Sequence, residues 1–110
     1  MARPKRLNIC GKLYKVRYFK NRLDVDPESN EPLWGACHFN NREIRIYSGA
    51  DGPDLMDTVI HEITHAILHE HQVLLAMVGE PNEEAFVNDL ASAITDCLIR
   101  NKLVRGDLFG

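Results

Sequence analysis

The sequence predicts an α+β fold, in which a small antiparallel sheet of about three strands packs on a helix that carries a His-Glu-x-x-His motif and on a second, C-terminal helix. Apolar and polar residues alternate in segments of the first half, as in half-buried strands. In the second half, apolar residues recur every three or four positions, as in amphipathic helices. With 110 residues and 45% hydrophobic content, the chain suits a single domain, residues 1–110, with one core.

Three segments of the first half predict the strands. Residues 13–19 alternate apolar and basic side chains, and residues 34–39 and 43–47 flank the pair Asn40 and Asn41. Asparagine tolerates a positive φ, so this pair predicts a tight hairpin turn. Residues 21–32 contain acidic residues, Asn and Pro, and predict a loop before the hairpin.

The first helix is predicted over residues 53–71. Asp51 or Gly52 can cap this helix, and Pro53 suits its first turn. Asp54 and Asp57 complement the positive end of the helix. The predicted buried face consists of the apolar residues at helical spacing, Met56, Val59, Ile60, Ile63 and Ile67.

A second helix is predicted from Asn82, which can cap it, to about Asn101. Glu83 and Glu84 lie in its first turn. Residues 72–81 are mostly apolar and either extend the first helix or form a packed connection. The long apolar stripe of the second helix predicts extensive packing, and consists of Phe86, Val87, Leu90, Ala91, Ile94, Cys97 and Leu98.

Composition and charge narrow the class of protein. The net charge is −3, so nucleic acid is an unlikely partner, and the basic residues of the N-terminal third predict a solvated strand face and tail. The sequence shows neither a secretory signal nor a membrane span, so no membrane partner is expected. Cys10, Cys37 and Cys97 are odd in number and far apart, which favours a reduced, cytoplasmic setting. Cys37 and Cys97 are expected to pack into the core.

The residues that indicate chemistry are the sequence H-E-I-T-H at positions 61–65. His61 and His65 lie one turn apart on one helical face, so both imidazoles can reach one metal ion. Glu62 can accept a proton from a water bound to that ion. This pattern is typical of zinc-dependent hydrolases, most often peptidases. Both histidines point away from the predicted apolar stripe, toward a second layer or a cleft.

A catalytic zinc site usually takes a third protein ligand, and the two further histidines fit poorly. His69 lies about 12 Å from His61 along a straight helix, too far for one shared ion. His71 would need a glycine at position 68 to swing back toward the ion, and this chain has Leu68.

Two carboxylates at the start of the second helix remain as candidates for the third ligand. Glu83 and Glu84 stand 18 and 19 positions after His65, which leaves enough chain for a reversal and a helix packed across the first. The helical wheel places Glu83 near the centre of the apolar stripe and Glu84 toward its edge. The residues alone therefore favour Glu83 and leave Glu84 as the alternative.

The motif and the helix that follows it resemble a known family. H-E-I-T-H-A-I-L-H at 61–69 and E-E-x-F-V-x-x-L-A at 83–91 are similar to the ImmA/IrrE group of small zinc metallopeptidases, especially its compact phage and prophage relatives. The similarity covers roughly residues 33–101. It implies a minimal zincin-like fold of the gluzincin type, in which Zn²⁺ is bound by His61, His65 and a glutamate four residues before an asparagine.

Glu84 and Asn88 keep that spacing, so the resemblance favours Glu84 as the third ligand. This chain departs from the family in two respects. It has Thr-Asp-Cys-Leu at 95–98 where the family's helix usually ends in Leu-Leu-Met-Pro, and the DNA-binding domain that often accompanies such enzymes is not in the sequence.

Together these features predict a zinc metallopeptidase that acts on a protein or peptide, with Glu62 as the general base. The strand at 43–47 would dock an extended substrate if it lies at the sheet edge. His38, Tyr47 or His69 would stabilise the oxyanion, and Asn88 would orient a ligand.

The alternative function is a metal-stabilised binding or regulatory module, such as a phage or prophage protein without turnover. A structural zinc would contribute folding energy to so small a core. The presence of Glu62 favours the enzyme, because a structural site needs no general base.

Overall fold

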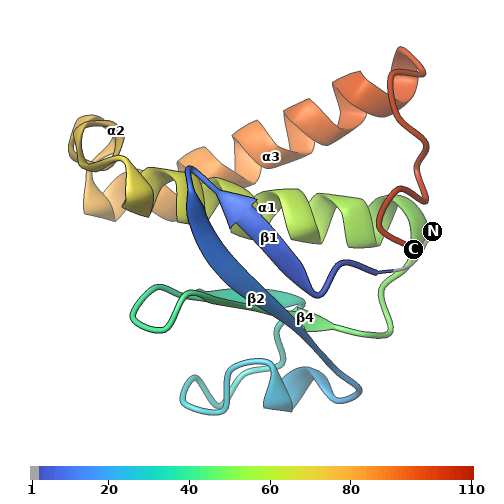
Figure 1. Cartoon of the computed structure of the whole chain (residues 1–110), viewed down its shortest axis with the longest axis horizontal. Coiled ribbons are helices and arrows are strands. Elements are labelled where there is room, and N and C mark those ends of the chain that lie inside the picture. The colour runs from blue at the N-terminus through green and yellow to red at the C-terminus, as the bar shows by residue number, and fades with distance from the viewer. Residues whose placement is uncertain (1–2) are drawn as a thin grey trace.

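Three layers make up the computed structural model, which describes residues 3–110: a mixed sheet, a helix that lies across the sheet, and a second helix packed on the first (Figure 1). The strands are β1 (Arg6–Ile9), β2 (Lys12–Phe19), β3 (Gly35–His38) and β4 (Glu43–Tyr47). The helices are α1 (Gly52–Glu70), α2 (Gln72–Val78) and α3 (Glu83–Arg100), with short 3₁₀ turns at Arg22–Asp24 and Glu80–Asn82. The predicted α+β class is confirmed.

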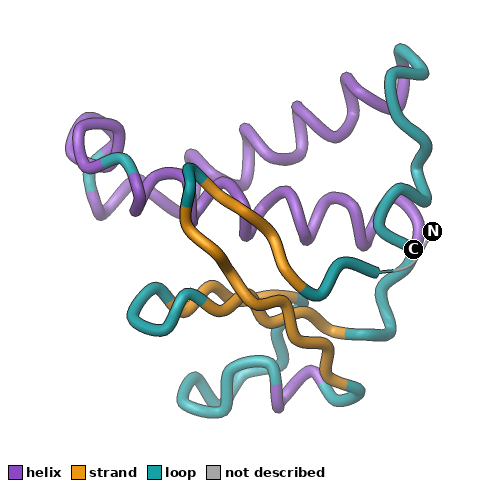
Figure 2. The backbone as a smooth tube through the Cα atoms, viewed as in Figure 1, coloured by secondary structure: helices purple, strands orange, loops and turns teal. Residues whose placement is uncertain are grey.

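The sheet has four strands in the order β1-β2-β4-β3. The β1/β2 and β3/β4 pairs are antiparallel, whereas β2 and β4 run parallel. The three predicted strands are present, but the sheet is not antiparallel throughout. A parallel pair needs a long crossover, and the loop at 20–34 followed by β3 supplies it (Figure 2).

The fourth strand, β1, was not predicted, and only its first residue, Arg6, belongs to the segment 1–6 that was predicted to be a solvated tail. Cys10 and Gly11 form the turn between β1 and β2, with φ of 55° and 82°. Positive φ at both central residues matches the right-handed twist of a hairpin, but cysteine is an unusual residue at the first of them, so Gly11 alone signals the turn. Within the predicted tail, residues 1 and 2 lie outside the described part of the chain, and Arg3 donates to the carbonyls of Ser48 and Ala50.

The β3–β4 hairpin forms as predicted, but its loop is longer than the Asn40-Asn41 pair. The Arg42 N–H donates to the Phe39 carbonyl, and Arg42 rather than an asparagine takes the positive φ, 48°. The Arg42 guanidinium reaches Glu70 at the end of α1, and the Tyr14 hydroxyl donates to the same carboxylate at 2.6 Å. These contacts tie the end of α1 to the sheet.

Helix α1 begins after Asp51, with Pro53 in its first turn, as predicted. Leu55, Val59 and Ala66 are fully buried against the sheet. Because α3 covers the opposite side, α1 is buried on two faces (Figure 1). The second buried face brings polar groups inside, and these are Glu62, Thr64 and His65.

Residues 72–81 do not extend α1. Residues 72–78 form the separate helix α2, in which Leu75 and Val78 are half-buried while Val73 and Met77 are largely exposed. Helix α3 turns Val87 and Ala91 toward α1, while the other half of its predicted stripe lines an apolar groove of about 660 Å³ beside α2. The members of the stripe in this groove are Phe86, Leu90 and Ile94.

The two predictions about core cysteines have different outcomes. Cys37 in β3 packs against the core, as predicted. Cys97 is exposed, and the prediction was wrong, because α3 faces α1 with the neighbouring side of the helix, at Ala91 and Thr95. The C-terminal segment is docked rather than loose, since Phe109 packs against the core. Among the described residues, no helix is long and apolar enough to cross a membrane.

Replacement of Leu55 with alanine tests this core. Leu55 has no exposed surface, so Leu55→Ala should lower the free energy of unfolding by about 2–5 kcal/mol through lost burial and the cavity left behind. Urea titration followed by circular dichroism measures this loss. Leu103 is 68% exposed, so Leu103→Ala is the control and should change the free energy by less than about 0.5 kcal/mol. Equal effects of the two substitutions would contradict the packing of α1 on the sheet.

Candidate metal centre

Two turns of α1 and the first turn of α3 bring three metal-ligating side chains together. The His61 and His65 rings lie edge to face with centroids 4.9 Å apart. The Glu84 carboxylate reaches both rings, with Oε1 at 2.9 Å from His61 Nε2 and Oε2 at 3.0 Å from His65 Nε2. All three ligand atoms lie within 4.8 Å of one another.

This arrangement fits a metal ion. Tetrahedral zinc binds nitrogen and oxygen at about 2.0–2.1 Å, which places neighbouring ligand atoms about 3.3 Å apart. The Glu84 oxygens therefore need to withdraw from the imidazoles by only a few tenths of an ångström. The Glu84 side chain is 66% exposed and free to do so. Two imidazoles with one carboxylate form a donor set typical of catalytic zinc sites.

Glu83 contacts the side of the His65 ring that points away from Glu84. Its Oε2 lies 2.6 Å from His65 Nδ1, and its carboxylate also contacts His69 Nε2 at 3.2 Å. A proton on Nδ1 that is donated to Glu83 leaves the lone pair of His65 on Nε2, the atom that faces Glu84. The geometry thus matches the choice of Glu84 that the resemblance favoured, and not the choice of Glu83 that the helical wheel favoured.

The surroundings of His61 favour its uncharged form. Burial lowers the pKa of this histidine below its ordinary value, against the opposing effect of the Glu84 carboxylate. A lowered pKa keeps the imidazole uncharged at neutral pH, and an uncharged imidazole offers the lone pair that a metal needs.

Glu62 is the buried carboxyl group of the site. It is 5% exposed, and its Oε2 lies 4.0 Å from His61 Nε2. Burial, with a further effect of the Glu84 charge, raises the pKa of Glu62 to about 8. A cation at the centre would lower this pKa again, since opposite charge favours the carboxylate.

Gly35 in β3 leaves the space in front of Glu62. A Cβ atom at Gly35 would lie 2.9 Å from Glu62 Oε2 and 2.9 Å from Thr58 Cγ2. Any larger residue would therefore push against the carboxylate. The strand and the motif helix approach each other closely because this position has no side chain.

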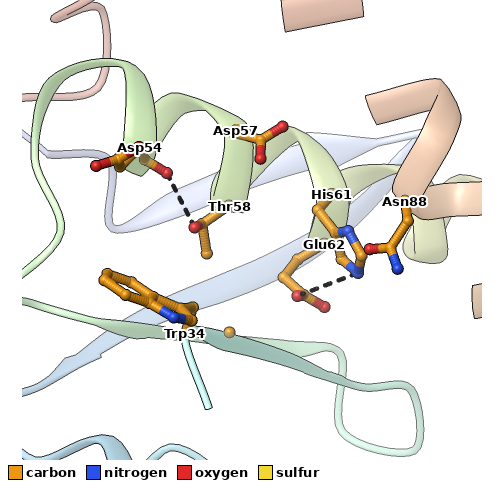
Figure 3. A pocket seen from close by; sticks show the side chains of 8 residues that line it. Trp34, Asp54, Asp57, Thr58, His61, Glu62 and Asn88 are labelled. Carbon is orange, nitrogen blue, oxygen red and sulfur yellow. Dashed lines mark hydrogen bonds and ion pairs between the residues drawn. The ribbon is translucent and has the colours of Figure 1, made fainter. Parts of the chain in front are cut away.

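Two clefts meet at the centre. One, of about 390 Å³, extends past Trp34 toward the start of α1 (Figure 3), and the other, of about 350 Å³, extends along β3 past Phe39. Gly35, His61 and Glu62 line both clefts. A ligand that lies along β3 would therefore pass directly over the motif.

The strand expected to dock a substrate is not at the sheet edge. Residues 43–47 form β4, which lies between β2 and β3, so its backbone groups are already paired and the condition for that prediction is not met. The edge next to the motif is β3. A short strand of four residues gives little sequence signal of its position in the sheet, which is set by the parallel β2/β4 pairing.

The three residues expected to stabilise an oxyanion do not line either cleft. His38 lies 3.8 Å from the Asp26 carboxylate, Tyr47 packs edge-on against Trp34, and His69 stacks on Phe39. Asn88 does line the cleft of Figure 3, beside His61.

His71 lies away from the metal centre. Its Nε2 contacts Cys10 Sγ at 3.1 Å. Trp34, Gly35 and Thr58 are site residues that sequence reasoning missed. Only the tertiary approach of β3 to α1 reveals them.

Comparison with known proteins adds no family to this description. No protein-family model, no curated protein and no solved structure matches the chain. The site is therefore interpreted from its own geometry.

Metal binding separates the two glutamates. Glu84→Gln removes a ligand and Glu83→Gln a supporting acceptor, so both should weaken zinc binding. We expect Glu83→Gln to lower the zinc affinity by about 10–100-fold. Glu84→Gln should lower it by more. Competition with a chromophoric chelator measures both affinities, and Glu80→Gln, at an exposed acid of the same segment, is the control. A larger loss in Glu83→Gln would reverse the two assignments.

Proposed function

We propose that this protein is a zinc-dependent metallopeptidase of the cytoplasm, with His61, His65 and Glu84 as metal ligands and Glu62 as the general base. The observation that carries the proposal is the convergence of three ligand atoms within 4.8 Å beside a buried carboxyl group that faces two clefts. The three free cysteines support a reducing compartment.

The division of work follows from the positions of the side chains. When bound, zinc supplies a Lewis acid that polarises a carbonyl and acidifies water. Glu62 holds the attacking water through Oε2, accepts its proton and passes it to the amide nitrogen of the departing product. Glu62 is buried and lines both clefts, so water and substrate would reach its carboxyl group through them.

The β3 edge is the surface that would align a peptide. It lies next to the motif, and Gly35, Ala36 and Cys37 line the cleft along it. An extended peptide that pairs with the free edge of β3 would place one of its carbonyl groups over the metal centre. Asn88, beside His61, is an amide donor in reach of the cleft (Figure 3), in place of the three residues first expected to stabilise the oxyanion.

The alternative, a metal-stabilised binding or regulatory module, has one observation in its favour. Phe86, Leu90 and Ile94 are partly exposed in an apolar groove beside α2, and exposed apolar surfaces often bind partners. This module would keep a metal and gain stability from it without cleaving peptides.

Glu62→Gln distinguishes the two functions. The amide cannot accept a proton, so cleavage should fall by about 10²–10⁴-fold while zinc binding persists. A peptide library digested by the zinc-loaded protein and analysed by mass spectrometry measures cleavage, and metal content is measured on the same sample. Glu31→Gln, at an exposed loop residue, is the control. If the wild type cleaves nothing while zinc raises its melting temperature, the binding module is the better account.

Gly35→Ala tests the position of Glu62 separately. The added Cβ must displace the Glu62 carboxylate or Thr58, and a displacement near 1 Å costs up to about 100-fold in rate. The ligands are untouched, so zinc affinity should stay within about twofold. Ala93→Ser, at an exposed position of α3 that lines neither cleft, is the control. Full activity in Gly35→Ala would contradict the close approach of β3 to the general base.

A further inference from the structure

The cleft of about 390 Å³ beside the metal centre has an acidic and aromatic lining (Figure 3). We propose that it binds a positively charged substrate side chain, arginine or lysine, close to the scissile bond. This specificity rests on the proposed peptidase function and extends it to a class of substrate. The residues that would contact the side chain are Trp34, Asp54 and Asp57, and Glu62, the proposed general base, lines the same cleft.

The first support is charge. Asp54, Asp57 and Glu62 line the cleft, and none of its lining residues is Lys or Arg. Asp57 is partly buried and accepts a hydrogen bond at 3.3 Å from Ser92 of α3, which fixes it in the wall between the two helices. A concave surface lined by one sign of charge attracts the opposite sign.

The second support is the unpaired carboxyl group of Glu62. This residue is 95% buried, since its exposed fraction is 5%. Within residues 3–110 its carboxyl group forms no hydrogen bond, and its contact with His61 Nε2 is 4.0 Å. The carboxyl group still reaches solvent through the cleft, because it is not among the fully enclosed polar atoms that lack a partner. A buried acceptor without a partner indicates that the cleft receives a polar or charged ligand.

The third support is Trp34, whose indole forms the opposite wall. Aromatic faces attract guanidinium and ammonium groups. The ring already holds one guanidinium, that of Arg22, whose Cζ lies 4.6 Å from the ring centroid and which donates to the carbonyls of Pro32 and Leu33. Arg22 does not line the cleft, and its single positive charge is outnumbered by the carboxylates of Asp54 and Asp57.

A second metal ion fits this cleft less well than an organic cation. Among the described residues, the group of three side chains placed to hold a metal is His61, His65 and Glu84, and neither Asp54 nor Asp57 belongs to one. An arginine or lysine needs only one or two carboxylates and an apolar wall along its stem. Asp54 also lies in the first turn of α1 and complements its N-terminus, but that function needs neither a cleft nor Trp34.

Trp34 is the only tryptophan of the chain, so it reports on this cleft directly. Its fluorescence should be titrated with N-acetyl-arginine amide and with the uncharged isostere N-acetyl-citrulline amide, on the zinc-loaded and on the chelator-treated full chain. The arginine compound should bind at least about fivefold more tightly than citrulline. Asp57→Asn should remove this preference and Asp54→Asn should weaken it, while Asp89→Asn, on the exposed side of α3, should leave it unchanged.

Equal binding of the two compounds, or a preference that survives both Asp57→Asn and Asp54→Asn, overturns the proposal. A thermal melt of each variant tests whether it is folded, and substitution at two separate positions keeps the test valid if one variant fails to fold. Cleavage of the peptide library by the wild type adds a second readout, in which cut sites should be enriched in Arg or Lys at one position. Cleavage without that enrichment overturns the specificity and leaves the peptidase. Arginine-selective binding without any cleavage retains the cation site and overturns the peptidase.

Discussion

The contact on which the rest of the site depends is the docking of the first turn of α3 against two turns of α1. The two consecutive glutamates of this turn have different positions. Glu83 contacts His65 Nδ1 at 2.6 Å, while Glu84 faces Nε2 of both motif histidines. Val87 and Ala91 are buried against α1 and fix the rotation of α3 about its axis. A rotation by one residue, about 100°, would exchange the two carboxylates.

Without a bound cation, the buried titratable groups of the site would lower the stability of the folded state. Glu62 and His65 are buried. Burial raises the pKa of Glu62, and the charge of the Glu84 carboxylate raises it further. Sites that bury titratable groups in this way are characteristic of function rather than of stability. A cation shared by the two imidazoles and Glu84 would offset the repulsion between these carboxylates, and so stabilise the folded state on binding.

Much of the fold was predictable because its elements carry strong local periodicity. The helices at 52–70 and 83–100 and three of the strands lie close to their predicted positions. The missing strand β1 has four residues and ends in a turn without a glycine-rich signal at its first position. The parallel pairing of β2 with β4 is a long-range choice that no local pattern records, and it decides that β3 and not β4 lies at the edge beside the motif.

The candidate site was predictable in part for the same reason. His61, Glu62 and His65 sit on one helix at a fixed spacing, so their proximity follows from helix geometry alone. The choice between Glu83 and Glu84 depends on how α3 packs on α1. The wheel of an isolated helix placed Glu83 deeper than Glu84, and this is how they lie, but the deeper carboxylate contacts His65 Nδ1 and only Glu84 faces Nε2 of both histidines. Asp54 and Asp57 were explained by the helix terminus, and only the approach of Trp34 across the cleft gives them a second function.

X-ray absorption spectroscopy at the zinc edge, on protein purified without chelator, tests the central claim most directly. We expect one zinc per chain with two imidazole ligands and oxygen in the remaining positions, and no sulfur. A protein that binds no zinc, or a spectrum with a thiolate ligand such as that of Cys37, which lines the second cleft, would contradict the proposed centre.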